Sequence, residues 1–181
     1  MGRRENGTDV AGSPDVDDGL RMGIRLFIEA YNELSGRIGK EATKEVVAKA
    51  MYRTGLRLGE EARELVDTND TIGMARAWDI IYGTGTDAAE LLDKERFIIR
   101  GQGCAAFNLF KRWGISDDEI RFLADAYCIG DVGHAEGFGG KEMDFQHTSR
   151  LMRGDDFCEW DFAMGELEQA EGAVTKPGLK E

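Results

Sequence analysis

The chain has 181 residues, of which 41% are apolar and 32% charged, a composition typical of a globular protein with a single core. Its formal net charge of −12 argues against a nucleic-acid partner, because binding to backbone phosphates needs clustered lysines and arginines. No apolar run approaches the roughly 20 residues of a membrane helix, so we expect no membrane partner. The first residues lack the apolar segment of a secretory signal. We therefore expect a cytoplasmic protein whose three cysteines, an odd number, are reduced thiols.

Three helices are predicted in the N-terminal half, after a polar and disordered segment over residues 1–17. Apolar stripes place them over about residues 18–35, 40–66 and 71–82. Gly55 and Gly59 lie inside the second helix, where each weakens the helix by roughly 1 kcal/mol relative to alanine. Close packing against another element is the alternative reason for these two glycines.

The C-terminal half has a mixed pattern. Residues 96–100 predict a strand, and a Gly-Gln-Gly turn then leads into a helix over residues 104–113. Ser116 and Glu119 form a capping box that begins another helix over residues 117–127. The glycines between residues 130 and 140 predict a long irregular loop.

A β-hairpin is the clearest element of the sequence. Residues 142–152 and 157–164 alternate in polarity, and residues 153–156 form the turn between them. A symmetric register gives an inward face with the pairs Leu151 and Cys158, Ser149 and Trp160, and His147 and Phe162. The same register gives a solvent face with the pairs Arg150 and Glu159, and Thr148 and Asp161.

The order of these elements predicts an α+β fold, in which N-terminal helices pack on a small antiparallel sheet that ends in a C-terminal β-hairpin. We expect one domain over residues 18–165 and a flexible tail over residues 166–181. The long apolar helices suggest a homodimer.

The side chains that carry nucleophilic or proton-transfer chemistry gather in the C-terminal half of the chain. Cys104 follows the glycine turn at the first turn of a helix, where free N–H groups and the helix dipole favour the reactive thiolate. A small buried residue that starts a packed helix is the alternative interpretation.

Two further groups are candidates. Cys128, Asp131 and His134 lie close together in the sequence, where the carboxylate can orient the imidazole and the imidazole can activate a thiol. His147 and Cys158 share the inward face of the hairpin with Trp160, so they line either a pocket or the core. A buried helix-end thiol and a core histidine are the alternatives.

A metal site is a weaker hypothesis. The cysteines and histidines suit zinc or iron, but the chain has no C-x-x-C or H-x-x-x-H pair, so we expect no metal and no cofactor. Arg96, Arg100 and Arg150 are the candidates to bind a substrate carboxylate, with surface ion pairs as the alternative.

Three segments resemble the L-2-amino-thiazoline-4-carboxylic acid hydrolase family: GCAAFNLFKRWG, DAYCIGDVGHAEGF and FQHTSRLMRGDDFCEWDF. Proteins of this family combine an N-terminal helical part with a cysteine, a later Cys-x-x-Asp, and a closing Gly-Asp-x-x-Cys-x-aromatic strand. The matching positions are Cys104, Cys128 with Asp131, and Gly154, Asp155, Cys158 and Trp160. The hairpin is also similar to the small-molecule-binding domains of the 4-vinyl-reductase type.

The family resemblance implies ring-opening hydrolysis of a cyclic amidine-like C=N centre, which gives an S-carbamoyl cysteine. From the chemistry of the residues we expect Cys104 to attack the amidine carbon or position water, and Asp131 with His134 or His147 to transfer protons. Arg100 or Arg150, Trp160 and Cys158 are the expected substrate-binding residues. A non-catalytic small-molecule sensor and a cysteine-ligated metal or redox protein are the alternative hypotheses.

Overall fold

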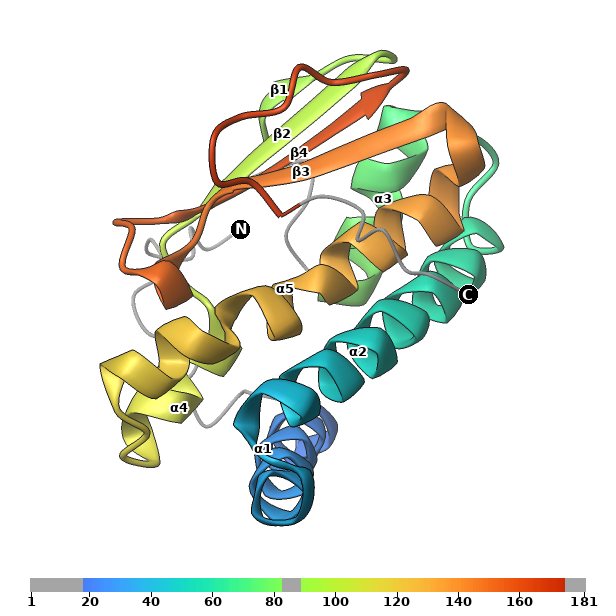
Figure 1. Ribbon diagram of the computed structural model, residues 1–181. Helices are drawn as coiled ribbons and strands as arrows, with labels where there is room; N and C mark the ends of the chain where they lie inside the picture. The colour runs from blue at the N-terminus through green and yellow to red at the C-terminus, as the bar shows by residue number, and fades with distance from the viewer. Residues whose placement is uncertain (1–17, 83–88, 175–181) are drawn as a thin grey trace.

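The computed structural model describes residues 18–82 and 89–174, which form an α+β fold as predicted (Figure 1). The predicted terminal segment 1–17 and the residues after 174 lie outside the described part of the chain. The elements are α1 (Asp18–Ile38), α2 (Lys40–Arg63), α3 (Thr71–Tyr82), β1 (Ala89–Leu92), β2 (Arg96–Gly101), α4 (Ala105–Arg112), α5 (Asp117–Gly139), β3 (Met143–Ser149) and β4 (Cys158–Met164). Short 3-10 helices cover Gly140–Glu142 and Leu151–Arg153.

The sheet is antiparallel, with strand order β1-β2-β4-β3. Helix α5 lies between this sheet and α2, and α3 covers the sheet beside α5 (Figure 1). Helices α1 and α4 lie at the end of the molecule away from α3. Within the described residues, no helix is both long enough and apolar enough to cross a membrane.

The predicted loop between residues 130 and 140 is wrong, because α5 begins at the Ser116 cap and continues without a break to Gly139. Its glycines are required by packing. A Cβ on Gly133 would lie 2.9 Å from the Leu56 amide nitrogen, and one on Gly137 would lie 3.0 Å from the Glu60 amide nitrogen. Such distances are shorter than real Cβ contacts, so only glycine lets α5 pack this closely on α2.

The glycines of α2 fit the same interface from the other side. A Cβ on Gly55 would lie 2.8 Å from the carbonyl carbon of Gly130, and one on Gly59 would lie 2.7 Å from the Phe138 amide nitrogen. The prediction that Gly55 and Gly59 allow close packing is therefore confirmed. Because the glycine face of α5 contacts α2, its opposite face is left to meet α3 and the sheet.

The hairpin is present, but its predicted register is wrong by two residues. His147 pairs with Trp160 and Phe145 pairs with Phe162, whereas Cys158 lies opposite Gly101 of β2. The cause is an irregularity between His147 and Ser149 and the 3-10 helix at residues 151–153, which together lengthen the connection. A shift of two residues preserves the faces of the strands, so His147 and Trp160 still share the inward face.

The predicted solvent face of the hairpin is partly covered. Asp161 is 2% exposed and accepts a bidentate hydrogen bond from Arg96, while Arg150 is 2% exposed and binds Asp125 of α5. The chain after β4 runs back over this face, where Gln146 bonds to the backbone of residues 168 and 170. This part of the predicted tail is thus hydrogen-bonded to the sheet.

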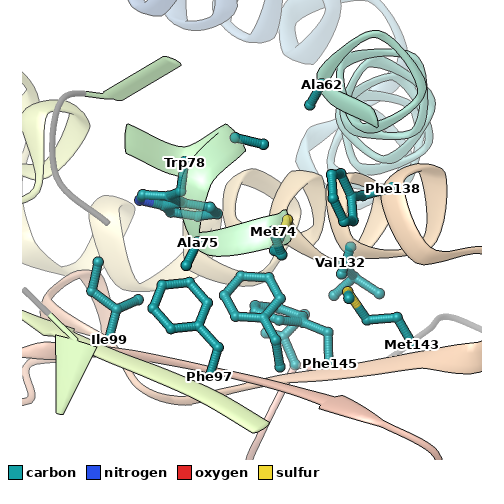
Figure 2. Packing of buried hydrophobic residues seen from close by; sticks show 14 of the residues in the cluster. Ala62, Met74, Ala75, Trp78, Phe97, Ile99, Val132, Phe138, Met143 and Phe145 are labelled. Atoms are coloured by element: carbon teal, nitrogen blue, oxygen red, sulfur yellow. The ribbon is translucent and has the colours of Figure 1, made fainter. Parts of the chain in front are cut away.

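The core that positions the site lies between the sheet, α3 and α5. Figure 2 shows Trp78 of α3 over Ile99 and Phe97 of β2, with Phe145 of β3 and Val132 of α5 beside them. All five are buried. One apolar cluster therefore holds the sheet and both helices together. The backbone positions that carry the neighbouring site residues are fixed by this packing.

Candidate active site

Cys104 caps the N-terminus of α4. Its backbone is extended, and its Sγ accepts a hydrogen bond from the Phe107 amide at 3.4 Å. A thiol that receives an N–H at a helix N-terminus is stabilised as the thiolate. The residue is partly buried.

Cys158 is the immediate neighbour of this thiol. Cys158 begins β4 and pairs with Gly101, which precedes Cys104 by three residues in the chain. Its Sγ accepts a hydrogen bond from the Leu151 amide at 3.4 Å. The hydrogen bond from the Cys158 thiol is the largest effect that lowers the pKa of Cys104, with the Phe107 amide acting in the same direction. The same contact raises the pKa of Cys158, together with its burial. Cys104 is therefore the thiol of the pair that ionises, and Cys158 is the donor that stays protonated.

Asp131 projects from the face of α5 that is opposite the glycine face. Its Oδ2 accepts the indole N–H of Trp160 at 3.0 Å. Burial raises the pKa of Asp131 from 3.8 to about 6, and the hydrogen bond from Trp160 opposes this rise. The side chain still keeps 30% of its exposure, so the carboxylate is partly buried and not sealed in the core. Its negative charge raises the pKa of Cys104 and so opposes the two hydrogen bonds that lower it.

His147 of β3 faces the same carboxylate. Its Nδ1 is 3.5 Å from Oδ2 of Asp131, and its ring stacks on Trp160 with the centroids 5.0 Å apart. Neither ring nitrogen has a hydrogen-bond partner among the described residues, although the side chain is 2% exposed. Burial, aided by the charge of Arg150, lowers the pKa of His147 to about 3, so the imidazole is neutral at pH 7.

His134 lies one turn after Asp131 on α5 and contacts α3. Its ring stacks on Trp78 at 5.6 Å, and its Nδ1 is 3.4 Å from the hydroxyl of Tyr82. Burial lowers its pKa to about 4, and its Nε2 also has no partner in the described part of the chain. Burial raises the pKa of Tyr82, and the charge of Asp131 raises it further.

Cys128 also lies on this face of α5 but is 6% exposed. Burial raises its pKa well above the ordinary value, and the charges of Asp131 and Cys104 raise it further. The Cys128 thiol is therefore protonated at neutral pH, and it belongs to the buried apolar cluster that α5 forms with α1 and α4.

Of the three candidate arginines, Arg96 binds Asp161, and Arg100 and Arg150 are engaged with carboxylates as well. Arg100 projects from the outer face of the sheet, where it binds Glu159 and Glu90. Arg150 donates to Asp125 at 2.5 Å and to the carbonyl of Gly172 at 2.7 Å. Both guanidinium groups are thus paired in the folded chain.

The fold brings Cys104, Cys158, Asp131 and His147 together around Trp160, and His134 adjoins this group through Trp78. Sequence reasoning missed the contribution of α3, whose Trp78 and Tyr82 form one wall of the site. The available signal was their i, i+4 spacing on a predicted helix, which puts both rings on one side of it. It also missed that Trp160 binds Asp131.

No group of three or more histidine, cysteine or acidic side chains among residues 18–82 and 89–174 is arranged to hold a metal ion. A separate surface groove between α2 and α5 is lined in part by Glu60, Arg63 and Lys141, and it contains none of the candidate residues.

Comparison with known proteins assigns the family. A search of curated proteins finds no match to this chain. The sequence model of the L-2-amino-thiazoline-4-carboxylic acid hydrolases matches residues 21–162, a range that begins inside α1, ends inside β4 and includes every candidate site residue. The chain therefore belongs to the L-2-amino-thiazoline-4-carboxylic acid hydrolase family.

Proposed function

We propose that this protein hydrolyses a C–N bond in a small cyclic amidine or thiazoline, with Cys104 as the nucleophile. The observation that carries the proposal is the position of Cys104, which caps α4 with an amide N–H and the Cys158 thiol directed at its sulfur. The family supports hydrolysis of a thiazoline carboxylic acid as the class of reaction.

In the first step, the Cys104 thiolate attacks the amidine carbon of the substrate, and a C–S bond forms as the C=N bond becomes single. The substrate enters as the protonated amidine, so the ring nitrogen leaves as a neutral amine when the ring C–N bond breaks, and the other amidine nitrogen forms the new C=N bond. Asp131 accepts a proton from one substrate nitrogen and returns it to the leaving nitrogen. Its pKa of about 6 suits both directions of this transfer near neutral pH.

In the second step, water attacks the same carbon, and Asp131 removes its proton and passes it to the product amine, which becomes an ammonium group. The Cys104–carbon bond breaks, and the sulfur leaves as the thiolate that the Phe107 amide and Cys158 stabilise. The product carries the new C=O, and the enzyme returns to its starting state. Each step uses side chains of this chain and water.

The two histidines have a supporting role in this proposal. Both imidazoles are neutral at pH 7, so His147 has one N–H and one acceptor nitrogen for the substrate, whereas His134 has only its Nε2, because its Nδ1 contacts the Tyr82 hydroxyl. The unpartnered nitrogens of His147 and the Nε2 of His134 are buried, and leaving them unpaired is costly. A bound substrate with N–H groups removes that cost.

The test is turnover of a panel of 2-amino-thiazolines and cyclic amidines, measured by the appearance of the primary amine that ring opening forms. We expect wild-type protein to release amine, and Cys104→Ser, which keeps an oxygen cap on α4, to lose at least about 100-fold in rate. Lys111→Gln in the last turn of α4 is the matched surface control and keeps full activity. Full activity of Cys104→Ser contradicts the proposal.

A non-catalytic binding module is the second candidate, and the unpartnered imidazole nitrogens favour it equally. It predicts that panel members raise the melting temperature by equal amounts in wild type and Cys104→Ser, with no amine released from any of them. The two candidates are therefore separated in one set of measurements.

A further inference from the structure

We propose that Cys104 and Cys158 form an oxidation site, at which hydrogen peroxide oxidises the Cys104 thiolate and the Cys158 thiol then closes a disulfide with it. The inference goes beyond the proposed hydrolysis, because the disulfide forms whether or not Cys104 attacks a substrate. Its consequence for activity rests on the proposed function, since the disulfide occupies the sulfur that is the nucleophile there.

The fold brings the two cysteines together from separate elements. Backbone pairing of β2 with β4 sets Cys158 opposite Gly101, and the chain reaches Cys104 three residues later at the N-terminus of α4. The Cys104 Sγ accepts the Phe107 amide at 3.4 Å, which fixes its position. The Cys158 Sγ is fixed in the same way by the Leu151 amide at 3.4 Å. The two sulfurs are joined by a hydrogen bond, so they lie as close together as a disulfide requires before oxidation.

Exposure gives the two thiols different roles. Both are free, but Cys104 is partly buried whereas Cys158 is 2% exposed. A small oxidant from solvent therefore meets Cys104 first, and Cys158 is closed to other proteins and to large thiols. Cys104 is also the thiol of the pair that ionises, and peroxides oxidise thiolates.

The chemistry needs one hydrogen peroxide. The Cys104 thiolate attacks one peroxide oxygen, so that an S–O bond forms, the O–O bond breaks, and sulfur transfers two electrons to the peroxide. The departing hydroxide takes a proton from solvent and becomes water. The Cys158 sulfur then attacks the sulfenic sulfur, an S–S bond forms, and the S–O bond breaks. The Cys158 proton leaves with that oxygen as a second water, which completes the balance.

The first step prepares Cys158 for the second. In the reduced pair, the hydrogen bond to Cys104 is the largest cause that raises the pKa of Cys158. Conversion of the Cys104 thiolate to a neutral sulfenic acid removes this negative partner, so the Cys158 proton is held less firmly when its sulfur attacks. The Leu151 amide, which lowers the pKa of Cys158, stays in place.

Cys128 provides an internal control. It is 6% exposed and belongs to the apolar cluster of α5, α1 and α4. Cys104 acts on Cys128 through its charge, whereas it hydrogen-bonds to Cys158. The geometry therefore selects Cys158 as the partner of oxidised Cys104, and Cys128 stays a thiol.

Peptide mapping after treatment of the purified protein with hydrogen peroxide tests the inference. The sample is quenched in acid, alkylated with N-ethylmaleimide and digested without reductant. We expect the Cys104 and Cys158 peptides to be joined within one chain, at a mass lower by two hydrogen atoms than that of the separate thiol peptides, with Cys128 alkylated. A Cys104 sulfinic acid without this link, a link that includes Cys128, or an unoxidised Cys104 overturns the inference.

A pair of variants assigns the roles. Cys158→Ser keeps a hydroxyl donor beside Cys104 but cannot form the disulfide, so the Cys104 sulfenic acid should accumulate and be trapped by dimedone. Cys128→Ala keeps both sulfurs of the pair and should form the link at the wild-type yield. Absence of the dimedone adduct in folded Cys158→Ser, or loss of the link in folded Cys128→Ala, contradicts the inference. If either variant does not fold, the wild-type peptide map decides.

Activity separates this inference from the proposed function. On a substrate that the wild type hydrolyses, full oxidation should lower the rate at least about tenfold, and dithiothreitol should restore it. If the link forms and the rate is unchanged, the oxidation site stands and Cys104 is not the nucleophile of hydrolysis. If no link forms while Cys104→Ser is inactive, the proposed function stands and this inference is wrong.

Discussion

Replacing Asp131 with asparagine is expected to stabilise the protein while it removes activity. Burial holds the pKa of Asp131 at about 6 in the folded chain, against an ordinary value of 3.8. The folded state therefore disfavours the charged form, and this penalty is present at pH 7. At about 1.4 kcal/mol for each pKa unit, the rise corresponds to about 3 kcal/mol of unfolding free energy as an upper bound.

The sign of the pH dependence follows from the raised pKa. The contribution of Asp131 to stability is fully present below its unfolded pKa of 3.8 and is lost as the pH rises through about 6. The advantage of Asp131→Asn over wild type should accordingly be near its maximum at pH 7.5, about half as large at pH 5, and close to zero below pH 4. Asparagine keeps an oxygen that can accept the indole N–H of Trp160.

Urea denaturation at pH 5 and pH 7.5 measures this difference. Asp118→Asn is the control, because its carboxylate is exposed at the N-terminus of α5 and its loss costs less than about 1 kcal/mol at either pH. An Asp131→Asn protein that is less stable than wild type at pH 7.5, or whose advantage does not shrink at pH 5, refutes the view that Asp131 is destabilised by burial.

Three other predictions test separate parts of the account. Gly133→Ala should lose at least about 2 kcal/mol of unfolding free energy at the α2–α5 interface, whereas Gly36→Ala, with open space around its Cα in α1, should be neutral or more stable; equal effects would show that close packing does not explain the glycines. Trp160→Phe removes the N–H that lowers the pKa of Asp131, so the acid limb of kcat/KM should move above pH 6, and an unmoved limb means that another group controls it. Timed iodoacetamide labelling with peptide mapping should modify Cys104 first, and faster labelling of either other cysteine contradicts the assigned thiolate.

The α+β fold and the separate elements were predictable because each depends on local patterns. Ser116 caps its helix through the Glu119 amide, as the capping box predicts, and α3 has the predicted bounds. The inward face of the hairpin was also predictable, since alternation fixes which residues share a face.

Helix α5 shows where local reasoning fails. Five glycines between residues 130 and 140 argue against a helix, because glycine weakens helices and favours turns. The helix forms because Gly133 and Gly137 fit against the backbone of α2, and that contact is not visible in local propensity. The consequence for function is direct, since Cys128, Asp131 and His134 lie on one face of a packed helix rather than in a loop.

The predictions of the hairpin register and of the exposure of Arg150 were wrong for a related reason. The pattern of alternation cannot detect a strand irregularity at residue 147 or a 3-10 helix after it, and both change the pairing by whole residues. The predicted solvent exposure of Arg150 ignored the chain that returns after β4, whose Gly172 carbonyl accepts from this side chain. Contacts between segments far apart in the sequence decided both outcomes.

The most direct test of the account is the mass of the peptide that contains Cys104 during turnover. Wild-type protein is mixed with 2-aminothiazoline, quenched in acid within milliseconds to seconds, and digested for mass analysis. The account predicts a transient increase by the mass of one substrate on Cys104, because the ring-opened substrate stays bound through its amidine carbon until water attacks. Release of amine at full rate by Cys104→Ser, with no adduct on the wild-type peptide, would contradict it.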